Sequence, residues 1–281
     1  MDEDRRLDPI GVFDSGVGGL SVLKVLREEM PEEPVIYVGD QTHVPYGPRS
    51  LQQVRDFSEG ITNFLIGQGA KIIVVACNAA SAAALLALRR SFDQIQFVGM
   101  EPAIKPAAEQ TATRVVGVLA TPATFQGALY ASVLERFATG VEILQSTCPG
   151  LVQQIEKGDL EGALTRKILE DALQPMREKN VDTVVLACTH YPFVIPQIKE
   201  IVGKQVRVID PAPAVVRQTR RLLERGLLKH PGNVRGPVQF FTSGAPSFLE
   251  RLLPKLCGEQ AFVHQLDWEG DKLLKPAIVA G

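Results

Sequence analysis

The chain has 281 residues, which is long enough to bury a large core in one large α/β domain or two smaller ones. Its formal net charge of −2 gives no broad basic footprint for nucleic acid, and no apolar run approaches the ~20 residues that cross a bilayer. The N-terminus is charged and is followed by no signal-type apolar stretch, so we expect a cytoplasmic protein whose partners are small molecules, without nucleic acid or membrane.

The first part of the chain alternates strand and helix signals. Apolar runs predict strands at 10–13, 35–38 and 72–76, and periodic apolar positions predict helices at 18–29, 51–66 and 80–90. The strand runs are apolar throughout rather than alternating, so both faces of the sheet should be covered. This is typical of a parallel sheet between helix layers.

The pattern restarts after residue 99. Segment 115–121 resembles segment 9–15, with its glycine 106 residues further on, and two strands that end in a cysteine are offset by 111 residues. We therefore predict two pseudo-symmetric parallel-sheet α/β domains with the active site in the cleft between them, the second spanning about 100–210. The tail after residue 210 is too small to stand alone, and periodicity leaves open which domain it joins.

The two strand-ending cysteines are Cys77 and Cys188. Parallel sheets place their ligands at this edge, and two thiols on opposite sides of a small substrate suit a reaction in which one removes a proton and the other supplies one. His190 is a candidate activator of Cys188, and Asp14 could act beside Cys77 if strand 10–13 neighbours strand 72–76. Buried structural thiols are the alternative for either cysteine taken singly.

The other two cysteines, Cys148 and Cys257, are expected to be structural, and a reducing compartment would keep all four as thiols. Cys188-x-His190 is not a usual zinc spacing, and the other histidines show no pairing with it. We expect no metal site.

The loop 14–19 has three interpretations. As a Gly-x-Gly turn at a helix start, with Asp40 about 20 residues on, it resembles a dinucleotide loop, but Ser21 stands where that fingerprint needs Gly or Ala. A tight turn that needs glycine only for its geometry is the second interpretation. We prefer the third, in which Asp14 and Ser15 face a small zwitterion, Asp14 near its ammonium group.

Two further features are ambiguous. The proline-rich segment 44–48 lies between a strand and a helix. Its sequence is equally consistent with a functional loop and with a loop that has no function. From its spacing alone, Glu156 reads as a solvated helix charge.

Five segments in chain order resemble the glutamate racemases of the aspartate/glutamate racemase superfamily, namely 11–20, 45–47, 77–78, 148–152 and 188–192. The resemblance implies a cofactor-independent, two-base interconversion of L- and D-glutamate that supplies D-glutamate for peptidoglycan. It implies that Cys77 deprotonates D-glutamate with help from Asp14, and that Cys188 deprotonates L-glutamate with help from His190 and Glu156. The residues it places around the substrate are Asp14, Ser15, Tyr46, Gly47, Asn78, Ala79, Thr121, Thr189 and His190.

The resemblance also implies a domain plan, with 9–99 plus 211–281 as the first domain and 100–210 as the second. The oligomeric state stays open, a homodimer among the alternatives. One position departs from the family, because Ala79 stands where a hydroxyl residue is usual. A hydrogen bond to a charged group contributes about 1.5 to 3 kcal/mol, so we expect its loss to weaken function rather than abolish it. A glutamate-binding protein of the same fold with impaired catalysis is therefore the alternative, and a nicotinamide-dependent oxidoreductase is a third.

Overall fold

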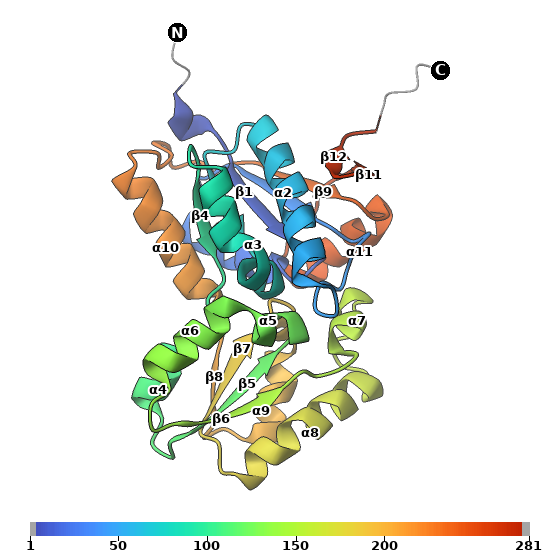
Figure 1. The fold of residues 1–281 in the computed structure, drawn as a ribbon. Helices are drawn as coiled ribbons and strands as arrows, with labels where there is room; N and C mark the ends of the chain where they lie inside the picture. Colours follow the sequence, from blue (N-terminus) through green and yellow to red (C-terminus); the bar gives the residue numbers. More distant parts are fainter. Residues whose placement is uncertain (1–3, 277–281) are drawn as a thin grey trace.

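The computed structural model describes residues 4–276. Residues 1–3, where the charged N-terminal segment begins, and residues 277–281, the end of the expected first domain, lie outside the described part. Two parallel sheets, each between layers of helices, lie one above the other in Figure 1. The predicted α/β class is confirmed.

The first sheet is parallel throughout. Its strands are, in spatial order, β10 (Val263–Gln265), β9 (Val238–Thr242), β2 (Val35–Gly39), β1 (Ile10–Asp14), β3 (Ile72–Val75) and β4 (Gln96–Gly99). Its helices are α1 (Leu20–Glu29), α2 (Leu51–Gly67), α3 (Asn78–Ser91), α10 (Ala212–Arg225) and α11 (Pro246–Leu256). A short hairpin, β11 (Asp267–Glu269) and β12 (Lys272–Leu274), and the 3-10 turn η1 (Arg5–Leu7) complete this part.

Successive residues along each central strand pack on opposite faces of the sheet. Val12 and Val74 lie in one buried cluster with α1, α10 and α11, whereas Phe13 and Val75 lie in another with α2 and α3. Because both faces are covered, every residue of β1, β2 and β3 is buried. This accounts for the unbroken apolar runs in the sequence.

The second sheet is also parallel throughout. Its strands are, in spatial order, β6 (Glu142–Ser146), β5 (Val115–Ala120), β7 (Thr183–Ala187) and β8 (Arg207–Ile209). Its helices are α4 (Ile104–Gln110), α5 (Pro122–Gln126), α6 (Ala128–Phe137), α7 (Leu151–Glu156), α8 (Ala163–Glu178), the 3-10 turn η2 (Tyr191–Val194) and α9 (Ile195–Val202).

The repeat in the sequence is a repeat in topology. The order β2-β1-β3-β4 in the first sheet matches β6-β5-β7-β8 in the second, strand for strand. Cys77 follows β3 and Cys188 follows β7, so the two thiols occupy equivalent positions. The predicted pair of pseudo-symmetric domains is therefore confirmed.

The tail after residue 210 contributes β9 and β10 to the first sheet, where β9 pairs with β2. We propose domain boundaries at 99/100 and 210/211, which this strand membership supports. One buried apolar cluster continues from the first sheet into the second, from Val17 and Leu20 to Leu119 and Tyr191. The domains thus share packed core as well as two crossovers of the chain.

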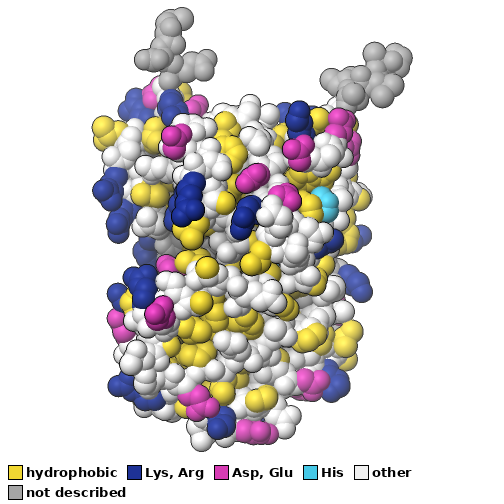
Figure 2. Space-filling model, viewed as in Figure 1, with side chains coloured by type: hydrophobic (Ala, Val, Ile, Leu, Met, Phe, Trp, Pro, Cys, Tyr) yellow, Lys and Arg dark blue, Asp and Glu magenta, His cyan; other side chains and the backbone are white. Residues whose placement is uncertain are grey.

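Among residues 4–276, no helix is both long and apolar enough to cross a membrane. On the face shown in Figure 2, basic and acidic side chains are interspersed over both domains. That face offers no extended basic surface of the kind nucleic acid requires.

Candidate active site

The carboxyl ends of β1, β3, β5 and β7 meet at the boundary between the domains. A small hollow of about 20 Å³ lies there. It is lined by Ser15, Pro45, Tyr46, Gly47, Cys77, Asn78, Ala79, Thr121, Val152, Cys188, Thr189 and His190. All the residues predicted for the site line it except Asp14 and Glu156, which lie directly behind it.

Cys77 caps the amino terminus of α3. Its Sγ accepts from the Ala80 amide at 3.5 Å and lies 4.0 Å from Ser15 Oγ. Burial raises the pKa of the Cys77 thiol well above its ordinary value, and the nearby charge of Asp14 adds to the rise, while the backbone N–H groups of Ala80 and Ser15 oppose it. These surroundings hold Cys77 as a neutral thiol.

Cys188 has a different environment. Its Sγ lies 3.9 Å from His190 Nδ1, and His190 Nε2 lies 2.6 Å from Glu156 Oε1, which also accepts from the Val17 amide at 2.8 Å. Burial disfavours a charged His190, but the hydrogen bonds to Cys188 and Glu156 and the charge of Glu156 outweigh it and raise the His190 pKa well above its ordinary value. This geometry supports the prediction that His190 helps Cys188, because an imidazolium stabilises a neighbouring thiolate.

Glu156 corrects one interpretation of the sequence. It is 8% exposed and bonded to His190, so the solvated helix charge inferred from its spacing is wrong. The reason is that α7 is short and ends against the other domain, a contact that helical periodicity does not report. Its role as a helper of Cys188 stays a prediction that this geometry supports.

Asp14 is fully buried at the end of β1, which neighbours β3 as required for an effect on Cys77. Its carboxylate accepts from the Gly16 amide at 2.8 Å and from Thr189 Oγ1 at 3.0 Å. Burial raises the pKa of Asp14, opposed chiefly by the charge of His190. Asp14 thus lies near both cysteines: its charge affects the pKa of Cys77, and its partner Thr189 adjoins Cys188.

Gly16 and Gly18 are required by close approach of the second domain. A Cβ on Gly16 would overlap the Glu156 carboxylate, and one on Gly18 would overlap the His190 ring and lie 2.6 Å from Thr189 Oγ1. The space that a pyrophosphate would need beside these glycines is filled by side chains. Domain contact therefore explains the Gly-x-Gly pattern without a dinucleotide.

The proline-rich segment lines the hollow through Pro45, Tyr46 and Gly47. Asp40, which the dinucleotide interpretation would make a ribose ligand, instead accepts from Tyr46 Oη at 2.6 Å, and also from Ser243 Oγ and Trp268 Nε1 at 2.6 and 2.8 Å. This buried carboxylate ties the loop to the carboxyl-terminal part of the first domain.

Asn78 is the strongest sign of a ligand. Its amide oxygen and nitrogen are buried, the residue is 3% exposed, and neither atom has a hydrogen-bond partner among the described residues. Leaving a buried polar group unpaired costs about 1 to 3 kcal/mol, so such a group in a site is normally paired by its ligand. The next residue, Ala79, contributes no side-chain donor. This was expected, because alanine stands here where the family usually has a hydroxyl residue.

Two lining residues were not predicted, Pro45 and Val152. Pro45 lay within the segment singled out, but Val152 carries no chemical signal in the sequence beyond its place after a Pro-Gly turn. Of the cysteines expected to be structural, Cys148 is buried and its pKa is raised to about 12 by burial, and Cys257 is half-buried. No group of three or more His, Cys, Asp or Glu side chains in the described part of the chain is placed to hold a metal ion.

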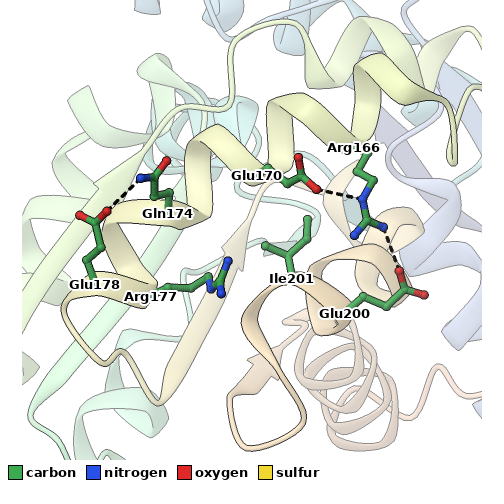
Figure 3. Close-up of a pocket in the computed structure, with 7 residues that line it drawn as sticks. All are labelled: Arg166, Glu170, Gln174, Arg177, Glu178, Glu200 and Ile201. Carbon is green, nitrogen blue, oxygen red and sulfur yellow. Dashed lines mark hydrogen bonds and ion pairs between the residues drawn. The ribbon is translucent and has the colours of Figure 1, made fainter.

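A larger hollow of about 670 Å³ lies elsewhere, between α8 and α9 (Figure 3). Its side chains are exposed except Ile201, and Arg166 pairs with Glu170 and Glu200 at 2.9 and 3.1 Å. Exposed ion pairs of this kind belong to an ordinary solvated helix face. The small closed hollow, with its thiols and unpaired amide, is the better candidate.

Comparison with known proteins agrees with this geometry. The family model described as Asp/Glu/Hydantoin racemase matches residues 12–219. A glutamate racemase of Pseudomonas paraeruginosa is 49% identical over 259 residues, covering 92% of this chain and 97% of the relative. The crystal structure of glutamate racemase isoform RacE1 from Bacillus anthracis is similar with a TM-score of 0.85 at 33% identity, covering 93% and 98% of the two chains.

A glutamate racemase from Francisella tularensis, solved in complex with D-glutamate, is also similar, with a TM-score of 0.81 at 28% identity over 92% of this chain and 97% of that one. The protein belongs to the Asp/Glu/Hydantoin racemase family. The resemblance drawn from five short segments of the sequence is confirmed.

Proposed function

We propose that this protein is a glutamate racemase that interconverts L- and D-glutamate without a cofactor, using Cys77 and Cys188 as two bases. The observation that carries the proposal is the pair of thiols at equivalent strand ends, on either side of one buried hollow with an unpaired amide. Relatives of high identity over nearly the whole chain are glutamate racemases, and one similar structure holds D-glutamate.

The substrate would pair with the unpaired amide of Asn78 and with the charged and polar groups around the hollow. Its ammonium group would lie near Asp14 and Cys77. Burial raises the pKa of both groups, and a positive charge at this position would lower them again. A carboxylate would accept from Asn78 and from the amino-terminal turn of α3, a helix of 14 residues. Ser15, Tyr46, Gly47, Thr121 and Thr189 would hold the remainder.

In the direction from L- to D-glutamate, the Cys188 thiolate takes the α-proton and the C–H electron pair stays on the α-carbon. The Cys77 thiol then donates its proton to the opposite face, forming a new C–H bond and leaving Cys77 as a thiolate. The reverse direction exchanges the two roles. The imidazolium beside Cys188 and the neutral Cys77 correspond to the state that accepts L-glutamate.

The reaction would supply D-glutamate for peptidoglycan in the cytoplasm, whose reducing conditions keep both thiols free. A homodimer stays a prediction. The second candidate is a glutamate-binding protein of the same fold with impaired catalysis, favoured by one observation, the missing hydroxyl at Ala79.

The test is incubation of the purified protein in D₂O with each glutamate enantiomer and no added cofactor. The optical rotation should decay to zero whether the reaction starts from L- or from D-glutamate, and deuterium should appear at the α-carbon. The matched control is the Cys77→Ala and Cys188→Ala double variant, which should do neither. Binding of glutamate by the wild-type protein with no α-deuterium exchange would favour the binding protein and contradict the racemase.

A further inference from the structure

We propose that Ser21, on α1 of the first domain, is a positioning residue for the Cys188 half of the site in the second domain. The proposal rests on the racemase function proposed above. Ser21 is 6% exposed, and its hydroxyl lies 2.9 Å from the Thr189 carbonyl oxygen and 2.8 Å from that of Gly18 in its own turn. The single hydroxyl proton is shared between the two carbonyls, and the contact with Thr189 crosses the domain boundary.

The Thr189 carbonyl belongs to the peptide unit that joins Thr189 to His190. Because this unit is planar, the direction of the carbonyl fixes where the backbone nitrogen and Cα of His190 lie, and with them the point from which its side chain starts. His190 has to reach Cys188 with one ring nitrogen and Glu156 with the other, at 3.9 and 2.6 Å. A donor to this carbonyl therefore helps to fix the ring between its two partners.

Two further contacts join Thr189 and His190 to the first domain. Thr189 Oγ1 donates to Asp14 Oδ2 at 3.0 Å, and the His190 ring rests on the backbone of Gly18, leaving no space for a Cβ. Ser21 is thus one of three contacts from the amino-terminal part of the chain, and it touches no reacting atom. Loss of its hydroxyl should loosen the His190 ring while the other contacts keep the domains together.

The matched pair of variants is Ser21→Ala and Ser58→Ala. Ser58 is also buried, but its hydroxyl donates at 2.7 Å to Val54 of its own helix, α2. We expect Ser21→Ala to lower kcat/KM by about 3- to 10-fold, equally in both directions because the enantiomers have equal free energy, and Ser58→Ala to leave it unchanged. The melting temperatures of the two variants should be similar.

The deciding readout is the α-deuterium isotope effect on kcat/KM with each enantiomer. Ser21→Ala should move the two isotope effects in opposite directions, in the same sense as Cys188→Ser, since both changes slow the proton transfer at Cys188. Should Ser21→Ala fail to fold, Ser21→Cys, which has a similar size and a weak donor, carries the same expectation.

Isotope effects that stay at their wild-type values, or that shift in the sense of Cys77→Ser, would overturn the assignment of Ser21 while leaving the racemase intact. Wild-type protein that binds glutamate without racemising it would instead contradict the function itself and this assignment with it.

Discussion

The two thiols occupy equivalent places in the fold but have unequal surroundings. Cys77 accepts a hydrogen bond from the Ala80 amide at the start of α3, and its pKa is raised by burial. Cys188 lies beside His190, whose own pKa is raised by its bonds to Cys188 and Glu156 despite burial. At the scale of single residues, the two thiols therefore differ in their charged neighbours, a carboxylate near Cys77 and an imidazole beside Cys188.

His190→Asn tests this asymmetry. The change should leave the fold intact and lower kcat/KM by about 10- to 100-fold in both directions, because the imidazolium beside Cys188 is lost. The ratio of wild-type to variant kcat/KM should be largest at neutral pH and fall as the pH rises through the raised pKa of His190. A fully active variant would show that Cys188 depends on another group.

The same residue has a consequence for stability. A histidine whose pKa is raised on folding contributes stability that is fully present below its unfolded value of 6.5 and is lost as the pH rises through its folded value. The difference in unfolding free energy between wild type and His190→Asn should thus be greatest below pH 6.5 and shrink above it. A difference that grows with pH, measured by denaturant titration, would contradict a charged His190 in the folded protein.

At the scale of elements, the turn before α1 and the first turn of α1 form the surface that the second domain contacts. Val17 donates to Glu156, Ser21 donates to Thr189, and Gly16 and Gly18 leave room for the side chains opposite. The glycines therefore serve the fit between domains rather than the turn alone.

Gly18→Ala should disturb that fit. Its Cβ would overlap the His190 ring, and a misplacement of about 1 Å in a site can cost about 100-fold in rate, so we expect a loss of kcat/KM of that order. The melting temperature should change little, since the overlap is relieved by a slight separation of the domains. The control is Gly67→Ala at the end of α2, where a Cβ would meet nothing within 4 Å. Wild-type kcat/KM in Gly18→Ala would refute this account of the loop.

At the scale of the whole molecule, the hollow between the domains has a smaller volume than the substrate we propose for it. A hollow of about 20 Å³ holds about one water molecule, and an amino acid is several times larger. We therefore predict that the domains separate to admit glutamate, and that bonds across their boundary, such as Val17 N–H to Glu156, break as they do so.

Hydrogen exchange can follow this opening. D-glutamate should slow the exchange of the Val17 amide, because a ligand held between the domains favours the closed form. The amide of Gly236 is bonded to Pro31 within the first domain, where both residues are half-buried, and it should exchange at the same rate with and without D-glutamate. Equal exchange of the Val17 amide in both conditions would mean that binding does not involve closure.

Much of the fold was predictable because its central strands are buried on both faces and repeat in the sequence. The ends of β3 and β7 then located the two thiols, and the end of β1 located Asp14. By contrast, β6 lies at an edge with exposed or half-buried residues, so it gave no apolar run and was not predicted.

Contacts between the domains were the part of the site that spacing could not predict. Glu156 reads as a helix charge, and Ser21 as an ordinary residue of a buried helix, until the second domain is placed against the first. Resemblance to the family pointed to Glu156, but it assigned no role to Ser21, nor to Val152, although Val152 lies in the matching segment 148–152. Residues that act across a boundary leave no periodic signal in either of the segments they join.

The most direct test of the two-base account is the α-deuterium isotope effect in Cys77→Ser and Cys188→Ser. Serine is far less acidic than cysteine, so each change should make its own proton transfer limiting. Cys77→Ser should enlarge the isotope effect with D-glutamate and reduce it with L-glutamate, and Cys188→Ser should do the reverse. Equal isotope effects in the two variants, or substantial retention of the substrate's deuterium in the opposite enantiomer made by wild-type protein, would contradict the assignment of one thiol to each face.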